Sequence, residues 1–158
     1  MDGEVKLHGL DDLITKLREI PSALRRRVLR NALAAGARVV RDDARRSAPV
    51  LSGAARAPYR KPGTVRNAIR VRTSKQARRV GDVGVYVNVR PAKGGNRGAK
   101  NANDPYYWRW LEFGTKKMAP RPFLQPAARR LGDALGVIQQ NLGKWFAKVN
   151  ATTKVTDT

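Results

Sequence analysis

The sequence predicts an α+β domain in which a small antiparallel sheet is covered by long N-terminal and C-terminal helices. Apolar residues recur at helical spacing near both ends of the chain, and two short stretches between them alternate strictly between apolar and polar residues. At 158 residues the chain has the length of one domain. We expect a single domain over residues 1–150, followed by a polar tail at 151–158 that frays.

Two helices are expected in the N-terminal part. Leucine and isoleucine recur at helical spacing over residues 8–20, and Pro21 ends that pattern. Ser22 is placed to cap the next helix, which should stop near Ser47 because Pro49 disfavours the helical region in the residue before it. The middle of this helix, residues 34–37, consists of three alanines and a glycine. Such a narrow segment allows close approach of another backbone, either the chain's own sheet or a neighbouring subunit.

Two strands are expected in the middle of the chain. Ile69, Val71 and Thr73 alternate with arginines over residues 67–73, and valines occupy alternate positions over residues 83–89. The short connection at residues 75–81 favours antiparallel pairing. Because two strands alone are marginally stable, the sheet should pack on the long helices or pair with another subunit.

The C-terminal helix carries a heptad-like apolar pattern beyond Pro126. Its apolar positions recur in alternating steps of four and three, at Leu124, Ala128, Leu131, Leu135, Ile138, Leu142, Trp145 and Val149. A helix with such a stripe needs a surface to cover it. That surface is either the chain's own sheet or, at the end with Trp145 and Phe146, a neighbouring subunit.

Residues 106–127 form the most distinctive segment. They hold six of the ten Phe, Trp and Tyr residues of the chain and three of its nine prolines, and aromatic rings at this density prefer burial. Gly114 permits a turn that other residues resist, and the prolines stiffen the path into the next helix. We expect a fixed structural joint made by Trp108, Leu111, Glu112, Phe113, Gly114, Thr115, Pro120, Arg121, Pro122, Phe123 and Pro126. In it Glu112 should either pair with Arg121 or accept backbone N–H groups near the turn.

The order of residues in this segment resembles a known family. An aromatic helix ending in Glu-Phe-Gly-Thr at 112–115, followed by Pro-Arg-Pro-Phe at 120–123, is similar to the tail-component family of long-tailed bacteriophages, with its tail-completion proteins and the minor tail protein Z. Residues 48–53 look like the Ala-Pro-x-x-Thr-Gly turn of that family. After that turn the family proceeds quickly to a Leu-x-x-Ser-Ile sequence at the start of a strand. This chain departs from the family because residues 54–64 are inserted before the corresponding Val-Arg-Asn-Ala-Ile at 65–69. The resemblance covers roughly residues 8–135.

The resemblance implies a structural virion protein of the phage neck or proximal tail, made in the cytoplasm of the bacterial host. It further implies a homo-oligomeric ring of six copies that joins or completes the tail. Neighbouring connector, tail-terminator or tail-tube proteins would be its partners. The interface between subunits is expected at Lys116, Lys117, Met118, Trp145 and Phe146.

The charge of the chain is strongly positive and unevenly placed. Lysine and arginine number 33 against 12 acidic residues, a formal net charge of +21. Residues 1–20 sum to −2, whereas residues 21–102 sum to +18. Such an excess suits a polyanionic partner such as packaged double-stranded DNA, although a basic surface also keeps a small protein soluble.

Two irregular basic stretches, residues 54–63 and 91–103, are expected to be mobile loops that carry function, the alternative being insertions tolerated on the surface. Their basic residues are the candidates to face a DNA channel: Arg56, Arg60, Lys61, Lys93, Arg97 and Lys100.

The residues for catalysis or for binding a cofactor or metal are missing from the sequence. There is no cysteine, and His8 is the only histidine. Asp42 and Asp43 are flanked by arginines, which predicts ion pairs on a helix surface rather than a metal site. No apolar run is long enough to cross a membrane. We therefore expect no enzyme, no cofactor and no membrane partner; the alternative function is a free-standing nucleic-acid-binding protein without sequence preference.

Overall fold

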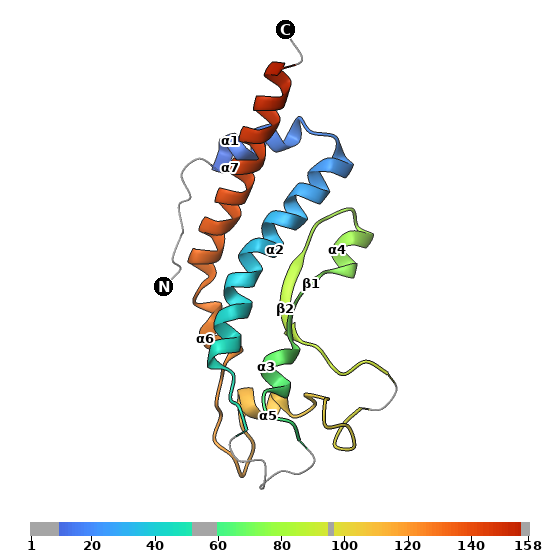
Figure 1. The fold of residues 1–158 in the computed structure, drawn as a ribbon, viewed down its shortest axis with the longest axis vertical. Coiled ribbons are helices and arrows are strands. Elements are labelled where there is room, and N and C mark those ends of the chain that lie inside the picture. Colours follow the sequence, from blue (N-terminus) through green and yellow to red (C-terminus); the bar gives the residue numbers. More distant parts are fainter. Residues whose placement is uncertain (1–9, 52–59, 95–96, 156–158) are drawn as a thin grey trace.

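The computed structural model describes residues 10–51, 60–94 and 97–155, and it has the α+β architecture that the sequence predicts (Figure 1). Two long helices lie side by side, and a two-stranded sheet lies against one of them. The elements in chain order are α1 (Leu10–Arg18), α2 (Ser22–Ser47), α3 (Thr64–Ala68), β1 (Ile69–Thr73), α4 (Lys75–Arg79), β2 (Val85–Val89), α5 (Trp108–Phe113), α6 (Leu124–Ala128) and α7 (Leu131–Val155).

The two N-terminal helices have nearly the predicted bounds. Helix α2 ends at Ser47, and Ala48 is extended before Pro49, as the steric effect of proline requires. The predicted capping role of Ser22 is wrong. Pro21 is the N-cap and no side chain caps the helix, so Ser22 is its first residue.

The sheet is antiparallel, as predicted, with Ile69 opposite Val89 and Thr73 opposite Val85. Both strands are shorter at their start than the alternation suggested. Asn67 belongs to α3, and Val83 precedes β2. The connection between the strands is the helix α4, which Ser74 caps by accepting a hydrogen bond from the backbone N–H of Ala77 at 3.1 Å.

The apolar seam predicted for the C-terminal helix holds only in part. The chain forms two helices, α6 and α7, with a break at residues 129–130. Ile138, Leu142 and Trp145 of the seam pack in the core, but Leu131 is 60% exposed and Val149 is 38% exposed. Ala134 and Phe146, which lie outside the seam, are buried. Residues 151–155, predicted to fray, continue the helix.

Helix α2 is the central element of the core. Its C-terminal half packs with β1, β2 and α6 around the fully buried ring of Phe123 and the side chains of Val65 and Ile69. Its N-terminal half packs with α1 and α7 around Leu17 and Leu142. The surface that covers α7 is therefore α2 together with α1, and not the sheet.

The narrow middle of α2 meets α7 of the same chain rather than the sheet. Gly36 is buried, and a Cβ atom placed on it would lie 2.6 Å from Cγ1 of Ile138 and 2.7 Å from the carbonyl oxygen of Ala134. The glycine therefore sets how closely the two long helices approach.

No helix within the described ranges is long and apolar enough to span a membrane.

Candidate functional site

The joint between α5 and α6 is held by one buried carboxylate. Glu112 is 5% exposed, and its Oε2 accepts the backbone N–H groups of Phe123 and Leu124 at 2.8 and 3.0 Å. Its Oε1 accepts the N–H of Gln125 at 2.8 Å. These donors lie at the start of α6, where a helix has no acceptors of its own. Of the two roles considered for Glu112, the structure therefore has the binding of backbone N–H groups.

The turn after Glu112 requires glycine. Gly114 has φ 74° and ψ −175°, a backbone conformation that is essentially restricted to glycine because a Cβ atom would clash. A Cβ atom there would lie 2.8 Å from the carbonyl oxygen of Met118 and 2.9 Å from the nitrogen of Pro120. The backbones of Thr115 and Met118 exchange hydrogen bonds of 2.9 and 3.2 Å, and the N–H of Arg121 donates to the carbonyl of Leu111 at 2.7 Å. Residues 114–121 are thus fixed through their backbone while the side chains of 115–121 point into solvent.

The expected burial of the aromatic run holds only in part. Phe123 is fully buried and Trp108 is half-buried, but Trp110 is 47% exposed and Phe113 is 73% exposed. Helix α5 is only six residues long, and the face with Trp108, Leu111 and Glu112 is the one turned to the core. The exposed rings of Trp110 and Phe113 give the joint an apolar surface. Aromatic side chains of this kind are enriched where proteins contact one another.

Arg60 is engaged by the aromatic run. Its guanidinium lies 4.6 Å from the ring centroid of Tyr107 and 5.6 Å from that of Tyr106, and it donates a 2.9 Å hydrogen bond to the Tyr106 hydroxyl. Burial raises the pKa of the Tyr107 hydroxyl, an effect that the charge of Arg60 opposes. Arg60 therefore anchors the segment before α3 on the joint, a role that its sequence position does not indicate.

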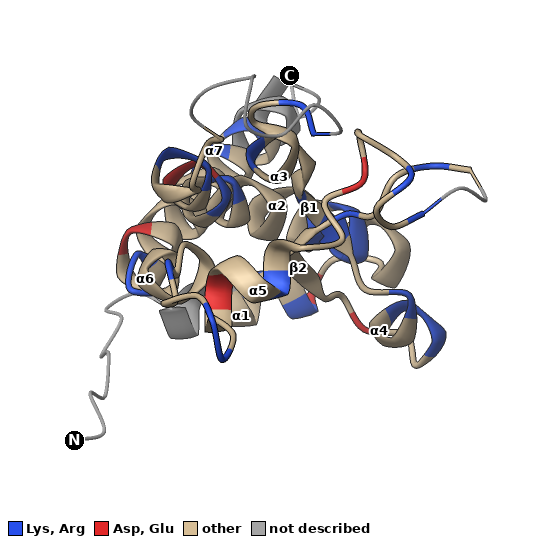
Figure 2. Cartoon of the chain, turned by 90° about the horizontal axis from the view of Figure 1, so that it is seen from below, with Lys and Arg blue, Asp and Glu red and all other residues tan. Residues whose placement is uncertain are grey.

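Asp104 closes the basic loop at residues 91–104. It is 2% exposed, and its carboxylate accepts the N–H groups of Ala92 at 3.0 Å and of Gly98 at 2.7 Å. Sequence reasoning missed this residue, although an aspartate before a proline in a run of Gly and Asn is a typical turn signal. The loop predicted as mobile is therefore clamped at both of its described parts. It projects on the side of the molecule away from α6 (Figures 1 and 2).

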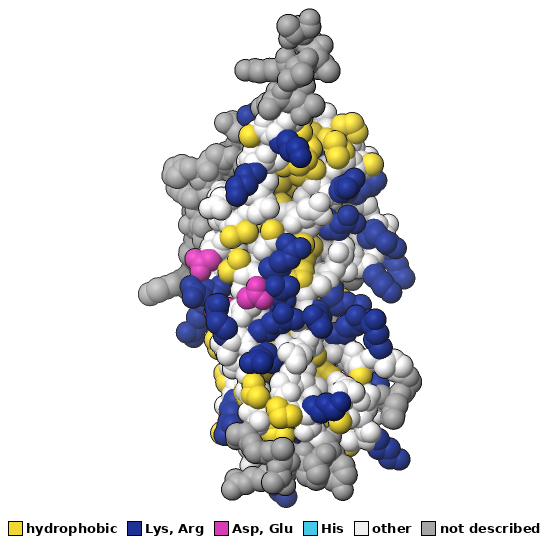
Figure 3. Space-filling view, in the orientation of Figure 1, with side chains coloured by type: hydrophobic (Ala, Val, Ile, Leu, Met, Phe, Trp, Pro, Cys, Tyr) yellow, Lys and Arg dark blue, Asp and Glu magenta, His cyan; other side chains and the backbone are white. Residues whose placement is uncertain are grey.

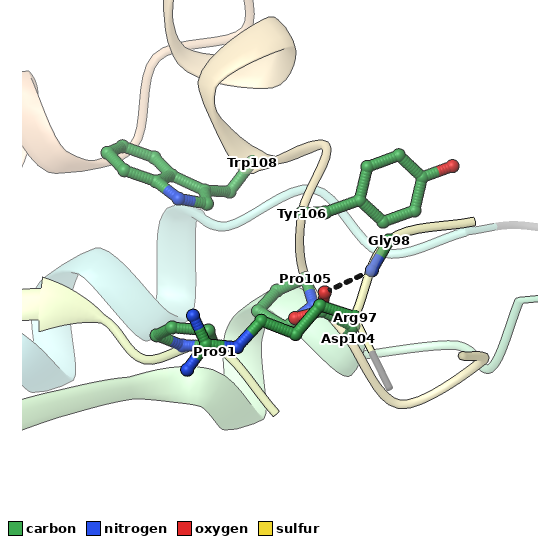
Figure 4. A pocket seen from close by; sticks show the side chains of 7 residues that line it. All are labelled: Pro91, Arg97, Gly98, Asp104, Pro105, Tyr106 and Trp108. Atoms are coloured by element: carbon green, nitrogen blue, oxygen red, sulfur yellow. Dashed lines mark hydrogen bonds between the residues drawn. The ribbon is translucent and has the colours of Figure 1, made fainter. Parts of the chain in front are cut away.

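A cleft of about 390 Å³ lies between this loop and α5. Figure 4 shows the indole ring of Trp108 facing Pro91 and the guanidinium of Arg97 across it, while the ring of Tyr106 points away. Its walls are mostly apolar, with Arg97 as the exposed cation.

The other predicted channel residues lie on the surface. Lys61, Lys93, Arg97 and Lys100 are all exposed, and the latter three share the clamped loop. Arg56 and His8 lie outside the described residues. The loops therefore present these basic side chains to solvent.

The predicted subunit contacts fall into two groups. Lys116, Lys117 and Met118 are exposed on the braced turn. In contrast, Phe146 is 8% exposed in the chain's own core, and Trp145 is half-buried against it with the two ring centroids 5.1 Å apart. Phe146 therefore has little surface left for another subunit.

The acidic pair on α2 forms the predicted ion pairs. Arg41 binds Asp42 at 2.8 Å, and its hydrogen bond lowers the pKa of that carboxyl. Arg46 binds Asp43 at 2.8 Å with the same effect on its pKa, and Arg130 lies 3.6 Å from Asp43. In the part of the chain that the structure describes, no cluster of three or more His, Asp or Glu residues could hold a metal ion.

Comparison with known protein families matches residues 11–114 to the family described as "Bacteriophage HK97-gp10, putative tail-component". The chain belongs to this family. The match to this phage tail-component family runs from α1 to Gly114, the turn residue of the joint, and so ends earlier than the resemblance noted in the sequence. Neither a curated protein nor a solved structure matches the chain.

Membership in the HK97-gp10-like family makes the chain a structural component of a phage tail and places it in the virion. Other tail or neck proteins are then its partners.

Proposed function

We propose that this tail component forms a ring, of six copies, that completes the tail at the head–tail interface and surrounds the DNA channel. Family membership and the charge of +21 are the observations that carry the proposal. A virion protein beside packaged DNA faces a polyanion, and attraction to phosphates without base contacts allows the DNA to pass.

The surface charge supports a polyanion as partner. Figure 3 shows Lys and Arg side chains spread widely over one face of the molecule, with few acidic side chains among them. Exposed basic residues occur on α2, α4 and the outer face of the sheet as well as on the loops, for example Arg38, Arg70 and Arg78. The field of such a surface attracts nucleic acid.

The joint supports the assembly part of the proposal. Its turn presents Lys116, Lys117 and Met118 on a backbone that is already ordered, so that docking would cost little conformational entropy. A contact between this turn and a different surface of the next copy is head-to-tail, and such contacts form a ring when the rotation between copies closes.

A phage lacking this protein tests the proposal. We expect filled heads and separate tails that fail to join, and rescue by the wild-type chain but not by a Lys116→Glu, Lys117→Glu variant. The variant should keep its circular dichroism spectrum, because neither side chain has a role in the core. Normal numbers of joined, infectious particles from the null phage would overturn the proposal.

The charge also favours a second candidate, a free-standing protein that coats nucleic acid without sequence preference. A monomer that binds DNA tightly, together with the absence of rings in negative-stain micrographs of the neck, would support it. A ring at the neck supports the first.

A further inference from the structure

An apolar groove of about 370 Å³ runs along the free side of the sheet. Leu33, Ala37 and Val40 of α2 form its floor. Strand β2 forms one wall, and α6 with the start of α7 forms the other, where Leu131 is 60% exposed. In the described part of the chain, nothing covers this apolar surface.

The wall made by β2 is an unpaired strand edge. Within the described residues the sheet has two strands only. The N–H of Ser74 donates to the carbonyl of Gly84, and the N–H of Arg90 donates to that of Ala68. The even-numbered residues of β2 are therefore the ones that exchange backbone hydrogen bonds with β1. The N–H and C=O groups of the odd-numbered residues Val85 and Val87 point the other way, to the side of the groove.

The opposite edge of the sheet is partly occupied. Arg45 of α2 donates to the carbonyl of Ile69 at 2.9 Å, and the N–H of Ile69 bonds to Arg66 in α3. The free edge and the apolar groove thus coincide on the β2 side. An extended segment lying there would gain backbone hydrogen bonds and bury every second side chain, which is the geometry of strand addition.

We propose that this groove receives residues 4–8 of a second copy of the chain as a third strand. In Glu4-Val5-Lys6-Leu7-His8 the apolar residues alternate with polar ones between two glycines. Paired with β2, Val5 and Leu7 would face the floor of the groove, and the three polar residues would lie on the outer face beside Tyr86.

The other segments beyond the described residues do not fit the groove. Residues 52–59 contain Pro58, which has no N–H group to donate to a strand, and no Val, Leu or Ile side chain to fill the groove. Residues 95–96 and 156–158 are too short.

Donation between copies, rather than within one, follows from where the segment begins. It leads into α1, whose Leu17 packs with Leu142 and Phe146 in the C-terminal half of α7. The groove lies beside the other half of α7, near Leu131 and Ala134. Figure 1 shows α1 near the end of the molecule away from α5 and α6. Each copy would both donate and accept a strand, which deepens the proposed ring by giving it a head-to-tail contact.

Disulfide trapping tests the proposal, because the chain has no cysteine of its own. One copy carries Glu4→Cys, Lys6→Cys or His8→Cys, and a second copy with a different tag carries Tyr86→Cys. A strand added antiparallel to β2 places one of these positions opposite Tyr86 in the closely spaced, non-hydrogen-bonded register that suits a disulfide. The two copies are mixed, oxidised, and examined by denaturing electrophoresis, both as purified chain and in particles of a null phage complemented with both. We expect one of the three pairs to shift to the mass of two chains carrying both tags.

The matched control replaces Tyr86→Cys with Arg72→Cys, its neighbour on β1 and the same face of the sheet. This position lies two strand spacings from the added strand, about 9.6 Å, beyond the reach of a disulfide, and should give no crosslink. Crosslinking within a single double-cysteine chain, without mixed dimers, would overturn donation between copies. Absence of every crosslink in both settings would overturn strand addition, whereas the proposed neck function depends on the null-phage phenotype and is judged separately.

Discussion

At the level of single residues, the joint depends on Glu112 and Gly114, which act through the backbone. The carboxylate supplies acceptors to three N–H groups at the start of α6, and the glycine allows the chain to reverse so that α6 returns to the core. Neither effect depends on the side chains of the exposed turn. The joint can therefore keep its shape while those side chains differ.

Gly114→Ala should lower the free energy of unfolding by about 2 to 4 kcal/mol, because it combines backbone strain with contacts under 3.0 Å to Met118 and Pro120. Chemical denaturation measures the change. The control is Gly136→Ala in α7, where a Cβ atom meets nothing within 4 Å and the change should be neutral or stabilising by up to about 1 kcal/mol. Equal losses in both variants would contradict a special turn at Gly114.

Glu112→Gln should lower the free energy of unfolding by about 2 to 4 kcal/mol, because one acceptor oxygen becomes a donor that faces backbone N–H groups in a buried site. The control is Asp133→Asn, which breaks an exposed ion pair with Arg130 and should cost less than about 1 kcal/mol. Urea unfolding of both variants decides the matter, and a small effect at Glu112 would show that water can satisfy the start of α6.

At the level of elements, α2 organises the molecule because its faces have different partners. One side carries Val28, Ala32 and Gly36 toward α7, and another carries Ala44 toward the sheet and Phe123. Leu33, Ala37 and Val40 lie between them and line the apolar groove. A helix with small and apolar residues on several faces packs on several sides.

Gly36→Ala should destabilise the fold by about 1 to 3 kcal/mol even though alanine is the better helix former, because the added methyl meets the backbone of Ala134 as well as Ile138. Thermal melts compare it with Gly143→Ala, where the added methyl meets no atom within 4 Å. If Gly36→Ala stabilises the protein as much as that control does, the close approach of α2 and α7 is wrong.

At the level of the whole molecule, the positive charge surrounds a small core and is not gathered in one place. Basic side chains are exposed on the loops and also on α4 and at the end of β2. Long-range attraction to DNA then depends on the net charge of the whole molecule, whereas direct contacts with phosphates depend on the basic residues of particular surfaces.

Replacing Lys61, Lys93, Arg97 and Lys100 with Gln should leave the fold intact and reduce the slope of log binding constant against log salt by up to about four, roughly one for each lost phosphate contact. Arg60 is kept because it packs on Tyr106 and Tyr107. The comparison variant replaces four exposed residues outside the two loops, Lys75, Arg78, Arg79 and Arg90. If only the comparison variant lowers the slope, the DNA contacts lie on α4 and β2 instead of the loops.

The sequence by itself determined the fold class, the long helix α2 to its last residue, the antiparallel pairing of the strands and the position of the turn at Gly114. Each of these follows from a local cause: helical or alternating periodicity, the steric effect of a proline, the shortness of a connection, or the freedom of a glycine.

Only the tertiary structure decided which surfaces meet. Ala134 and Phe146 of α7 are buried although they lie outside the predicted seam, and the approach of α7 to Gly36 could not be distinguished in sequence from the approach of a sheet. Asp104, Arg60 and the three N–H groups bound by Glu112 join segments that lie 6 to 46 residues apart. Such contacts depend on how the elements pack, which local periodicity does not encode.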